Sequence, residues 1–433
     1  MAKTVKDSKK VKTNTKKKSV KSKVKKNNSI KKASTKRKNK QSDGVFEKRL
    51  RFDMLEFFII IIFVSLVSCI GTGLILNYQY KKNNVLYNTS LVNDDNLSDF
   101  IKTYSEIVDN YYEEVDKKGM LNAATSAIVS YLKDNYSIYL DGDAAGVLNN
   151  SLENSYQGVG IVVSGNTVYH VYQDSPAFNA GIQEGDIIIR VNDKEITDEN
   201  RNDVPLYIKD GEKNHIVVLR NDEEMDFDVE TGKIYIPTVN TQTVEKNDKK
   251  VGYLSLSSFS SKSYNEFKDG LEKLEEEKID SLVIDLRGNS GGYLEMAKDI
   301  ASLLLEKDKV IYSLQNKKET TVEKDTTDEH RSYPIIVLVD GKSASASEVL
   351  AGALKDSYGA VLVGETTFGK GKVQTLMQRN DSLIKYTSAK WLRPNGECVD
   401  GEGITPDYET GNVVINKIIY DMQLQKAIDL ATK

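Results

Sequence analysis

Hydrophobic residues form one long uninterrupted stretch near the start of the chain. Residues 57–76, FFIIIIFVSLVSCIGTGLIL, contain no charged side chain. About 20 residues at a rise of about 1.5 Å each cover a bilayer core of roughly 30 Å. The pattern therefore predicts a single transmembrane helix, followed by a linker at residues 77–96 that is rich in Asn, Asp and Tyr.

Two regions follow, and they differ in the spacing of their apolar residues. In residues 97–150, apolar side chains recur at helical spacing as far as about Lys133, which predicts two helices in an N-terminal helical region. In residues 151–233, short apolar runs separated by glycine predict a small β domain. These runs are GVGIVV, VYHVY, DIIIRVN, HIVVLR and MDFDVE.

Residues 234–412 alternate between strand and helix patterns. The predicted strands are VGYLSL, SLVIDL, PIIVLVD and AVLVGE, and the predicted helices are Tyr264–Glu276, Tyr293–Leu305 and Ser345–Lys355. Such alternation predicts a mixed α/β domain whose sheet is covered on both faces. The last segment, 413–433, predicts a terminal helix over Val413–Ala431.

Charge is distributed unevenly along the chain. Residues 1–51 hold 21 Lys and Arg against three acidic residues, whereas the whole chain has a net charge of -4. Residues 1–56 lack the apolar side chains of a core, which predicts a disordered basic tail. The positive-inside rule keeps this tail cytoplasmic and places the rest of the chain outside the cell membrane. The tail can serve as a solvated topology signal or contact the anionic inner leaflet, and we expect no nucleic-acid partner.

The few cysteines and histidines bear on lipid attachment, disulfide formation and metal binding. Leu66-Val67-Ser68-Cys69 resembles a lipoprotein box, so a lipidated Cys69 is an alternative to the uncleaved anchor. The only other cysteine is Cys398, so we expect no disulfide within the chain. The three histidines have no metal-ligand spacing, and we therefore expect neither a metal nor another cofactor.

Two turns at the ends of predicted strands carry candidate chemistry. Open sheets bind ligands at the carboxyl ends of their strands, and "DLRGNSGG" (285–292) and "DGKSASAS" (340–347) lie there. The glycine-rich run can bring backbone N–H groups to a ligand, or it can be a simple turn. In the second turn, Ser345 and Glu348 form a capping-box pattern, so Ser345 can be a helix cap, a nucleophile or both.

No histidine has a recognisable spacing to these serines, so a nucleophilic serine would need another base. A lysine can serve if burial keeps its amine neutral. In "VLVGETTFGKGKVQ" (361–374), Lys370 lies between two glycines, and Gln374 follows four residues later. The alternative is that Lys370 is an exposed loop residue.

These stretches together resemble the C-terminal processing peptidases, also called tail-specific proteases, over about residues 98–410. The similar segments are "YLKDNYSIYLD", "SPAFNAGIQEGDIIIRVND", "DLRGNSGG", "SASASEVLAGALKD", "VGETTFGKGKVQ" and "RPNGECVDGEGITPD", in the family's order. The resemblance implies a crotonase/ClpP-like α/β protease core with an inserted PDZ domain. It also implies a serine endopeptidase that uses a Ser–Lys dyad.

The family's catalytic roles transfer to single residues of this chain. The resemblance implies that Ser345 is the nucleophile, that Lys370 is its general base and that Gln374 supports the lysine. The oxyanion donors would be the N–H groups of Ala346 and Gly291. Because the family often has N-N-G-G-G where this chain has GNSGG, Gly292 remains an alternative to Gly291.

The predicted β domain supplies a second candidate site. Gly158, Val159, Gly160 and Ile161 resemble a carboxylate-binding loop, where N–H groups receive a peptide's C-terminus and the peptide adds as a strand. The family's preference for apolar C-terminal tails follows from this resemblance. The alternative is a glycine-rich turn.

These observations favour a membrane-anchored, extracytoplasmic bacterial serine endopeptidase over a catalytically silent PDZ scaffold or a peptide-binding protein. Whether the PDZ domain activates or inhibits is left open. The helices before the PDZ segment and the terminal helix can pair two copies into a homodimer, or they can pack internally.

Overall fold

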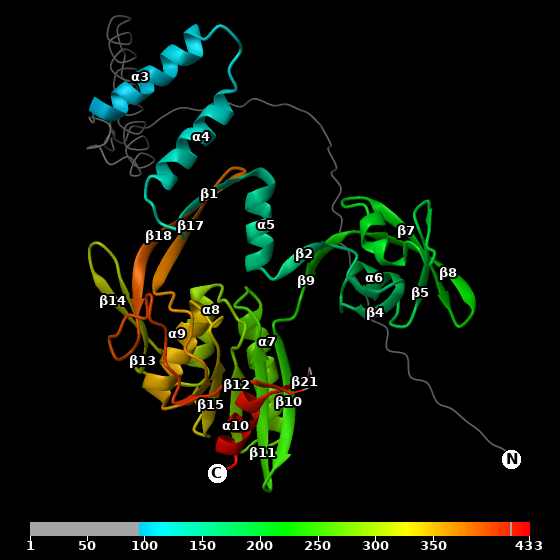
Figure 1. The fold of residues 1–433 in the computed structure, drawn as a ribbon, viewed down its shortest axis with the longest axis vertical. Helices are drawn as coiled ribbons and strands as arrows, with labels where there is room; N and C mark the ends of the chain where they lie inside the picture. The colour runs from blue at the N-terminus through cyan, green and yellow to red at the C-terminus, as the bar shows by residue number, and fades with distance from the viewer. Residues whose placement is uncertain (1–94, 416–417) are drawn as a thin grey trace, which may run out of the picture. The chain divides into compact units, whose positions relative to one another are not determined.

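The structure is a computed structural model that describes residues 95–415 and 418–433 (Figure 1). The chain divides into two units, residues 1–105 and 106–433. The described part of the first unit is the beginning of helix α3 (Asp95–Asn110). Within the described ranges, no helix is both long and apolar enough to cross a bilayer. The predicted transmembrane stretch 57–76 and Cys69 lie outside these ranges.

The N-terminal helical region contains the two predicted helices, α3 and α4 (Lys117–Ser130). Asp116 is the N-cap of α4, and its side chain accepts the N–H of Gly119. The region also contains β1 (Ile138–Asp141) and α5 (Gly142–Leu152), which the apolar pattern does not predict. Helix α5 has little apolar periodicity, and β1 depends on pairing with a distant strand.

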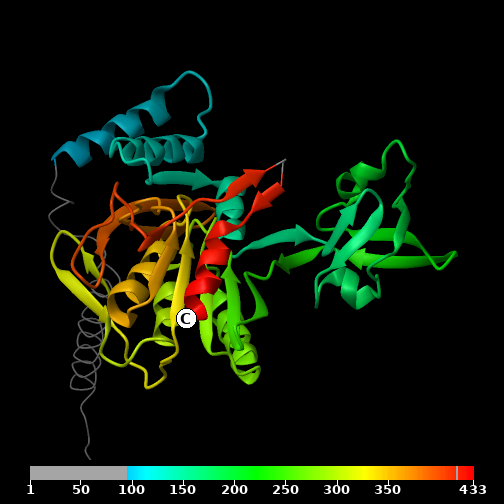
Figure 2. The same ribbon diagram turned by 60° about the horizontal axis from the view of Figure 1, so that its bottom comes forward.

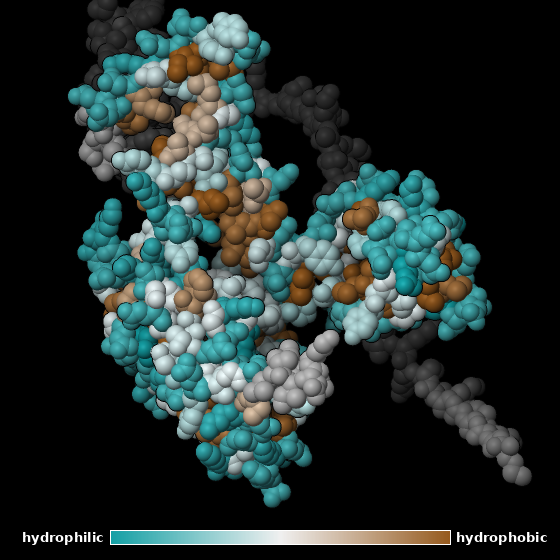
Figure 3. All heavy atoms as spheres, in the orientation of Figure 1, coloured by the Kyte–Doolittle hydropathy of each residue, from teal (hydrophilic) through white to brown (hydrophobic). Residues whose placement is uncertain are grey.

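Several apolar side chains of this region remain exposed. Ile128 on α4 is 66% exposed and Val147 on α5 is 69% exposed. Figure 3 shows hydrophobic residues gathered over α5. These side chains do not form an interior helix-helix contact in the described chain, and pairing of two copies stays a prediction.

The small β domain has a sheet with strand order β3-β4-β5-β7-β8, and β6 pairs with β5. Its elements are β3 (Ile161–Ser164), β4 (Thr167–Val171), α6 (Pro176–Ala180), β5 (Ile187–Val191), β6 (Lys194–Glu195), the 3-10 helix η1 (Arg201–Tyr207), β7 (Lys213–Arg220) and β8 (Glu223–Glu230). The chain enters and leaves this domain through an antiparallel pair, β2 (Ser155–Gly158) and β9 (Gly232–Tyr235), visible in Figures 1 and 2. The five predicted strand runs are thereby confirmed.

The small β domain contains a buried ion pair, and removal of this pair should destabilise the domain. Asp186 is 1% exposed and accepts two hydrogen bonds from Arg220, at 2.6 and 2.7 Å. Because Asp186→Asn leaves Arg220 without its charge partner, we expect the domain's unfolding free energy to fall by about 3 kcal/mol. Hydrogen exchange of β5 and β7 amides in the intact chain measures this. Asp198→Asn, at a fully exposed carboxylate, should leave exchange unchanged, and equal protection in both variants would contradict the prediction.

The protease-like domain is built on a six-stranded sheet of order β10-β11-β12-β15-β16-β19. Its strands are β10 (Val239–Lys246), β11 (Lys249–Leu256), β12 (Ser281–Asp285), β15 (Ile335–Val339), β16 (Val361–Gly364) and β19 (Tyr408–Glu409). Strand β10 is antiparallel to β11, and the other pairs are parallel. Three helices alternate with these strands: α7 (Ser263–Glu276), α8 (Leu294–Ser302) and α9 (Ala346–Ala353), which runs into the π-helix η2 (Leu354–Tyr358).

Both faces of this sheet are covered, as the alternation predicts. Leu282 and Ile284 of β12 pack with α7, α8 and α9. Val283, on the opposite face of the same strand, packs with helix α10 (Met422–Ala431), red in Figures 1 and 2. The central strands β12 and β15 are therefore buried at every position, because side chains on both faces have packing partners.

A second sheet brings distant segments together beside α9. Its order is β1-β18-β13-β14, with β17 also paired to β18. The strands are β13 (Val310–Gln315), β14 (Thr320–Lys324), β17 (Lys372–Arg379) and β18 (Ser382–Leu392). Strand β18 pairs with both β17 and β1, so the N-terminal helical region joins the protease-like domain.

The predicted terminal helix Val413–Ala431 is wrong in its first half. Two short strands, β20 (Val413–Ile415) and β21 (Ile418–Tyr420), form an antiparallel pair there, and the helix begins only at Met422. β-Branched residues dominate 413–419 and favour strands. Asp421 then caps α10 by accepting the N–H of Leu424.

Candidate active site

Ser345 lies in the turn between β15 and α9 and is the N-cap of that helix. Its backbone has φ 56° and ψ -114°, a region that residues other than glycine rarely adopt. Such strain persists only where surrounding contacts enforce it, and it clusters at functional sites. The strained backbone therefore makes Ser345 a candidate functional residue.

The two neighbouring serines have structural contacts. The Ser343 hydroxyl donates to the carbonyl of Leu286, and the Ser347 hydroxyl donates to the carbonyl of Asn289, both at 2.8 Å. Both serines are fully buried, whereas Ser345 is partly exposed. Of the three, Ser345 is the one that a substrate can reach.

Glu348 connects the serine turn to the lysine loop. Its side chain is fully buried. Oε2 accepts the N–H of Ser345 and the N–H of Lys370, both at 2.8 Å. The other oxygen, Oε1, accepts the N–H of Gly369 at 2.7 Å and the hydroxyl of Thr367 at 2.6 Å. The sequence predicts Glu348 only as a capping partner, and its contacts to the lysine loop were missed.

Lys370 lies in the loop just before β17. Its carbonyl accepts the indole N–H of Trp391 at 2.8 Å, which fixes the loop on the protein core. Burial lowers the pKa of the Lys370 ammonium, the positive charge of Lys385 lowers it further, and the carboxylate of Glu348 acts in the opposite direction. The lowered pKa favours the neutral amine that a general base needs.

Gln374 lies on β17 directly opposite Thr387 of β18. Its amide Nε2 donates to the Thr387 hydroxyl at 3.3 Å, and that hydroxyl donates to Asp134 at 2.6 Å. The structure thus gives Gln374 a partner on the neighbouring strand, and a direct contact with Lys370 stays a prediction. Asp134 and Thr387 were missed by the sequence analysis, since no local pattern points from either to the lysine.

The predicted oxyanion residues lie against the serine turn. A Cβ on Gly291 would fall 3.0 Å from Ser345 Cβ and 3.1 Å from the Ala346 nitrogen, so only glycine fits there. The Gly291 N–H donates to the side chain of Asn289 at 2.9 Å. Gly292 is held by a bridge to Phe259. Which of these N–H groups serves an oxyanion stays a prediction.

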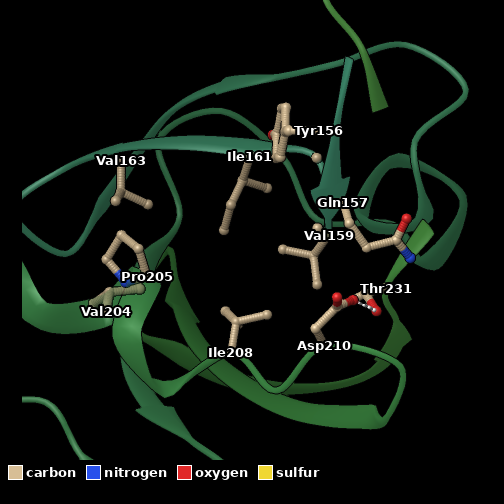
Figure 4. A pocket seen from close by; sticks show the side chains of 12 residues that line it. Tyr156, Gln157, Val159, Ile161, Val163, Val204, Pro205, Ile208, Asp210 and Thr231 are labelled. Carbon is tan, nitrogen blue, oxygen red and sulfur yellow. Dashed lines mark hydrogen bonds between the residues drawn. The ribbon is translucent and has the colours of Figure 1, made fainter. Parts of the chain in front are cut away.

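The predicted carboxylate-binding loop lines a pocket of about 250 Å³ in the β domain (Figure 4). Gly160 has a φ of 88° and lies so close to Ser175 that a Cβ would clash with it. The remaining lining residues outside Gly158–Ile161 are Tyr156, Gln157, Val163, Val204, Pro205, Ile208, Asp210 and Thr231. None of the 12 is positively charged, so an anion here depends on backbone N–H groups and on neutral donors such as Gln157.

The sequence matches known families over most of its described length. Residues 250–410 match peptidase family S41, residues 146–231 match the PDZ domain, and residues 74–144 match the N-terminal domain of the activating protease CtpB. The β domain described above is thus a PDZ domain.

Individual relatives cover more of the chain. The carboxy-terminal processing protease CtpB of Bacillus subtilis is 34% identical over 70% of this chain and 66% of its own length. A probable CtpA-like serine protease of Staphylococcus aureus is 31% identical over 87% of this chain and 78% of its own. Among solved structures, the photosystem II D1 C-terminal processing protease matches 77% of this chain and 91% of its own, with 22% identity and a TM-score of 0.46. The chain therefore belongs to the C-terminal processing proteases of peptidase family S41, as a serine-type peptidase with a PDZ domain.

Proposed function

We propose that this protease is a membrane-anchored, extracytoplasmic endopeptidase that cleaves by a Ser–Lys dyad and selects substrates by their C-termini. One observation carries the catalytic part: a single buried oxygen of Glu348 accepts the backbone N–H of both Ser345 and Lys370. The two backbone nitrogens are therefore less than two hydrogen-bond lengths apart. The lowered pKa of Lys370 supports its role as the base.

The proposed reaction is acyl transfer. The neutral Lys370 amine takes the proton of the Ser345 hydroxyl as the serine oxygen attacks the peptide carbonyl carbon. The N–H of Ala346 and one of the N–H groups at Gly291 or Gly292 stabilise the oxyanion, at about 3 kcal/mol per donor. The Lys370 ammonium then protonates the leaving amine. Water, deprotonated by the same lysine, hydrolyses the acyl-enzyme and releases Ser345.

The PDZ domain provides the proposed tail selection. Strand β3 is at the edge of its sheet and pairs with β4 on one side. A peptide can add to the other side, as in β-strand addition, with its carboxylate at residues 158–161. The apolar side chains of Val159, Ile161 and Ile208 point into the pocket and suit an apolar C-terminal residue (Figure 4).

A free apolar C-terminus should therefore accelerate cleavage. We expect a quenched-fluorescence peptide ending in an apolar residue with a free carboxylate to be cleaved with about tenfold higher kcat/KM than the same peptide amidated. A C-terminal amide lacks the negative charge that strengthens hydrogen bonds from the N–H groups of residues 158–161. Ser345→Ala should cleave neither peptide. Equal rates for the acid and the amide would refute tail selection while leaving the dyad untouched.

The proposed location rests on the chain before residue 95. The apolar stretch 57–76 would anchor the protease, and the basic tail 1–56 would remain at the anionic inner leaflet. The protease and PDZ domains would then meet their substrates outside the cell membrane.

A further inference from the structure

A segment outside the S41-matched region contacts the proposed catalytic lysine. The loop between α4 and β1 carries Tyr136, whose ring centre lies 5.2 Å from Lys370 Nζ and 5.4 Å from Lys372 Nζ. Tyr136 is partly buried at this position. An aromatic ring at this distance from an amine interacts with it directly and occupies space beside it.

The same loop is tied to Gln374 through hydrogen bonds. Asp134 Oδ2 accepts the hydroxyls of Ser137 and Thr387, both at 2.6 Å. The Ser137 hydroxyl also accepts the Thr387 N–H at 3.1 Å. Because Thr387 in turn accepts the Gln374 amide, the loop sets the position of both Thr387 and Gln374.

Pairing of β1 with β18 explains why the loop lies here. Ile138, the first residue of β1, is opposite Lys385 of β18, and residues 134–137 immediately precede it. The S41 match covers residues 250–410 and the CtpB N-terminal match covers residues 74–144. The environment of Lys370 is thus completed by a segment that the S41-matched region lacks.

We infer that residues 134–137 are a positioning element of the general base: Tyr136 shields the Lys370 amine from water, and Asp134 fixes Gln374 through Thr387. The inference rests on the proposed Ser–Lys dyad. It assigns these residues no contact with the substrate.

The charges around Lys370 determine the expected direction of the effect. Lys385 faces it from β18 and Lys372 from β17, while Glu348 of α9 is the nearby carboxylate. Asp134 pairs with Lys372 at 3.6 Å. The face of an aromatic ring attracts a cation, which favours the ammonium, but exclusion of water favours the amine. Since burial is the main cause of the lowered pKa of Lys370, the second effect should dominate.

The pH dependence of kcat/KM in the full-length protease tests this inference, with a quenched-fluorescence peptide that has an apolar free C-terminus. The rate should rise with pH as Lys370 loses its proton. Tyr136→Ala admits water to the Lys370 amine, so the rise in kcat/KM should move to higher pH by about one pH unit. At pH 7, kcat/KM should fall by about tenfold. Tyr136→Phe keeps the ring and should retain the wild-type profile. Tyr131→Ala, an exposed tyrosine nearby, should also leave it unchanged.

A second pair of variants tests the hydrogen-bonded branch. Thr387→Val keeps the shape but removes the hydroxyl, and it should lower kcat by about tenfold. Thr387→Ser keeps the hydroxyl and should restore most of the rate.

The outcomes separate this inference from the dyad. If Tyr136→Ala keeps the wild-type pH profile and Thr387→Val keeps the wild-type kcat while Lys370→Ala is inactive, the positioning role is refuted and the dyad stands. If Lys370→Ala is active, the dyad itself fails. If the Tyr136→Ala profile moves to lower pH, shielding from water is refuted.

Discussion

Replacement of Ser345 or Lys370 by alanine is expected to lower kcat for peptide cleavage by at least about 10⁴-fold, because nucleophile and base act as one unit. For the same reason, the double variant should be no slower than the slower single variant. Both side chains are partly exposed, so each variant should remain folded. Single-turnover kinetics and thermal unfolding of the full-length chain measure the two effects.

Two further substitutions test whether the base is a neutral amine at position 370. Lys370→Arg keeps the positive charge and similar length, but a guanidinium does not lose its proton near neutral pH, so this variant should be as inactive as Lys370→Ala. Lys342→Ala, at an exposed lysine in the serine turn, should keep wild-type activity. Near-normal turnover in Lys370→Arg would show that the amine is not the base.

The local pattern of residues predicts most elements that carry the proposed site. Strand β15 is an uninterrupted apolar run and α9 begins at a capping-box pattern, so the turn holding Ser345 falls between them as expected. The pattern fails where pairing with a distant strand decides the structure. Strand β1 forms because β18 pairs with it, and β20 and β21 are strands although their apolar residues also suit a helix.

The environment of the proposed base could not be predicted for a related reason. The side chains that surround Lys370 include Tyr136, Glu348 and Lys385, which lie in three separate segments of the chain. Each is an ordinary residue in its own local sequence, and Glu348 fits a capping box without any reference to Lys370. Burial of an amine is a property of the folded chain, so the sequence names the lysine but not what surrounds it.

Substitution of Glu348 is expected to lower both stability and activity. The carboxylate accepts four hydrogen bonds in a fully buried position. In Glu348→Gln, the amide nitrogen replaces one of the two oxygens. At Oε2 it leaves the N–H groups of Ser345 and Lys370 without an acceptor, and at Oε1 it leaves the N–H of Gly369 without one. At about 1–3 kcal/mol for each buried unsatisfied group, the free energy of unfolding should fall by about 3 kcal/mol. Denaturant unfolding of the full-length chain measures this loss.

Glu348→Ala removes Oε2, which holds the backbone of both Ser345 and Lys370, and this variant should separate the two residues. A displacement of about 1 Å between reacting groups can cost about 10²-fold in rate, so we expect kcat to fall by at least that factor at temperatures where the variant is folded. Glu365→Gln, at an exposed carboxylate after β16, is the matched control and should change neither quantity. A folded Glu348→Ala protease with wild-type kcat would show that the shared carboxylate does not align the dyad, and the arrangement of Ser345 and Lys370 would then have to depend on other contacts.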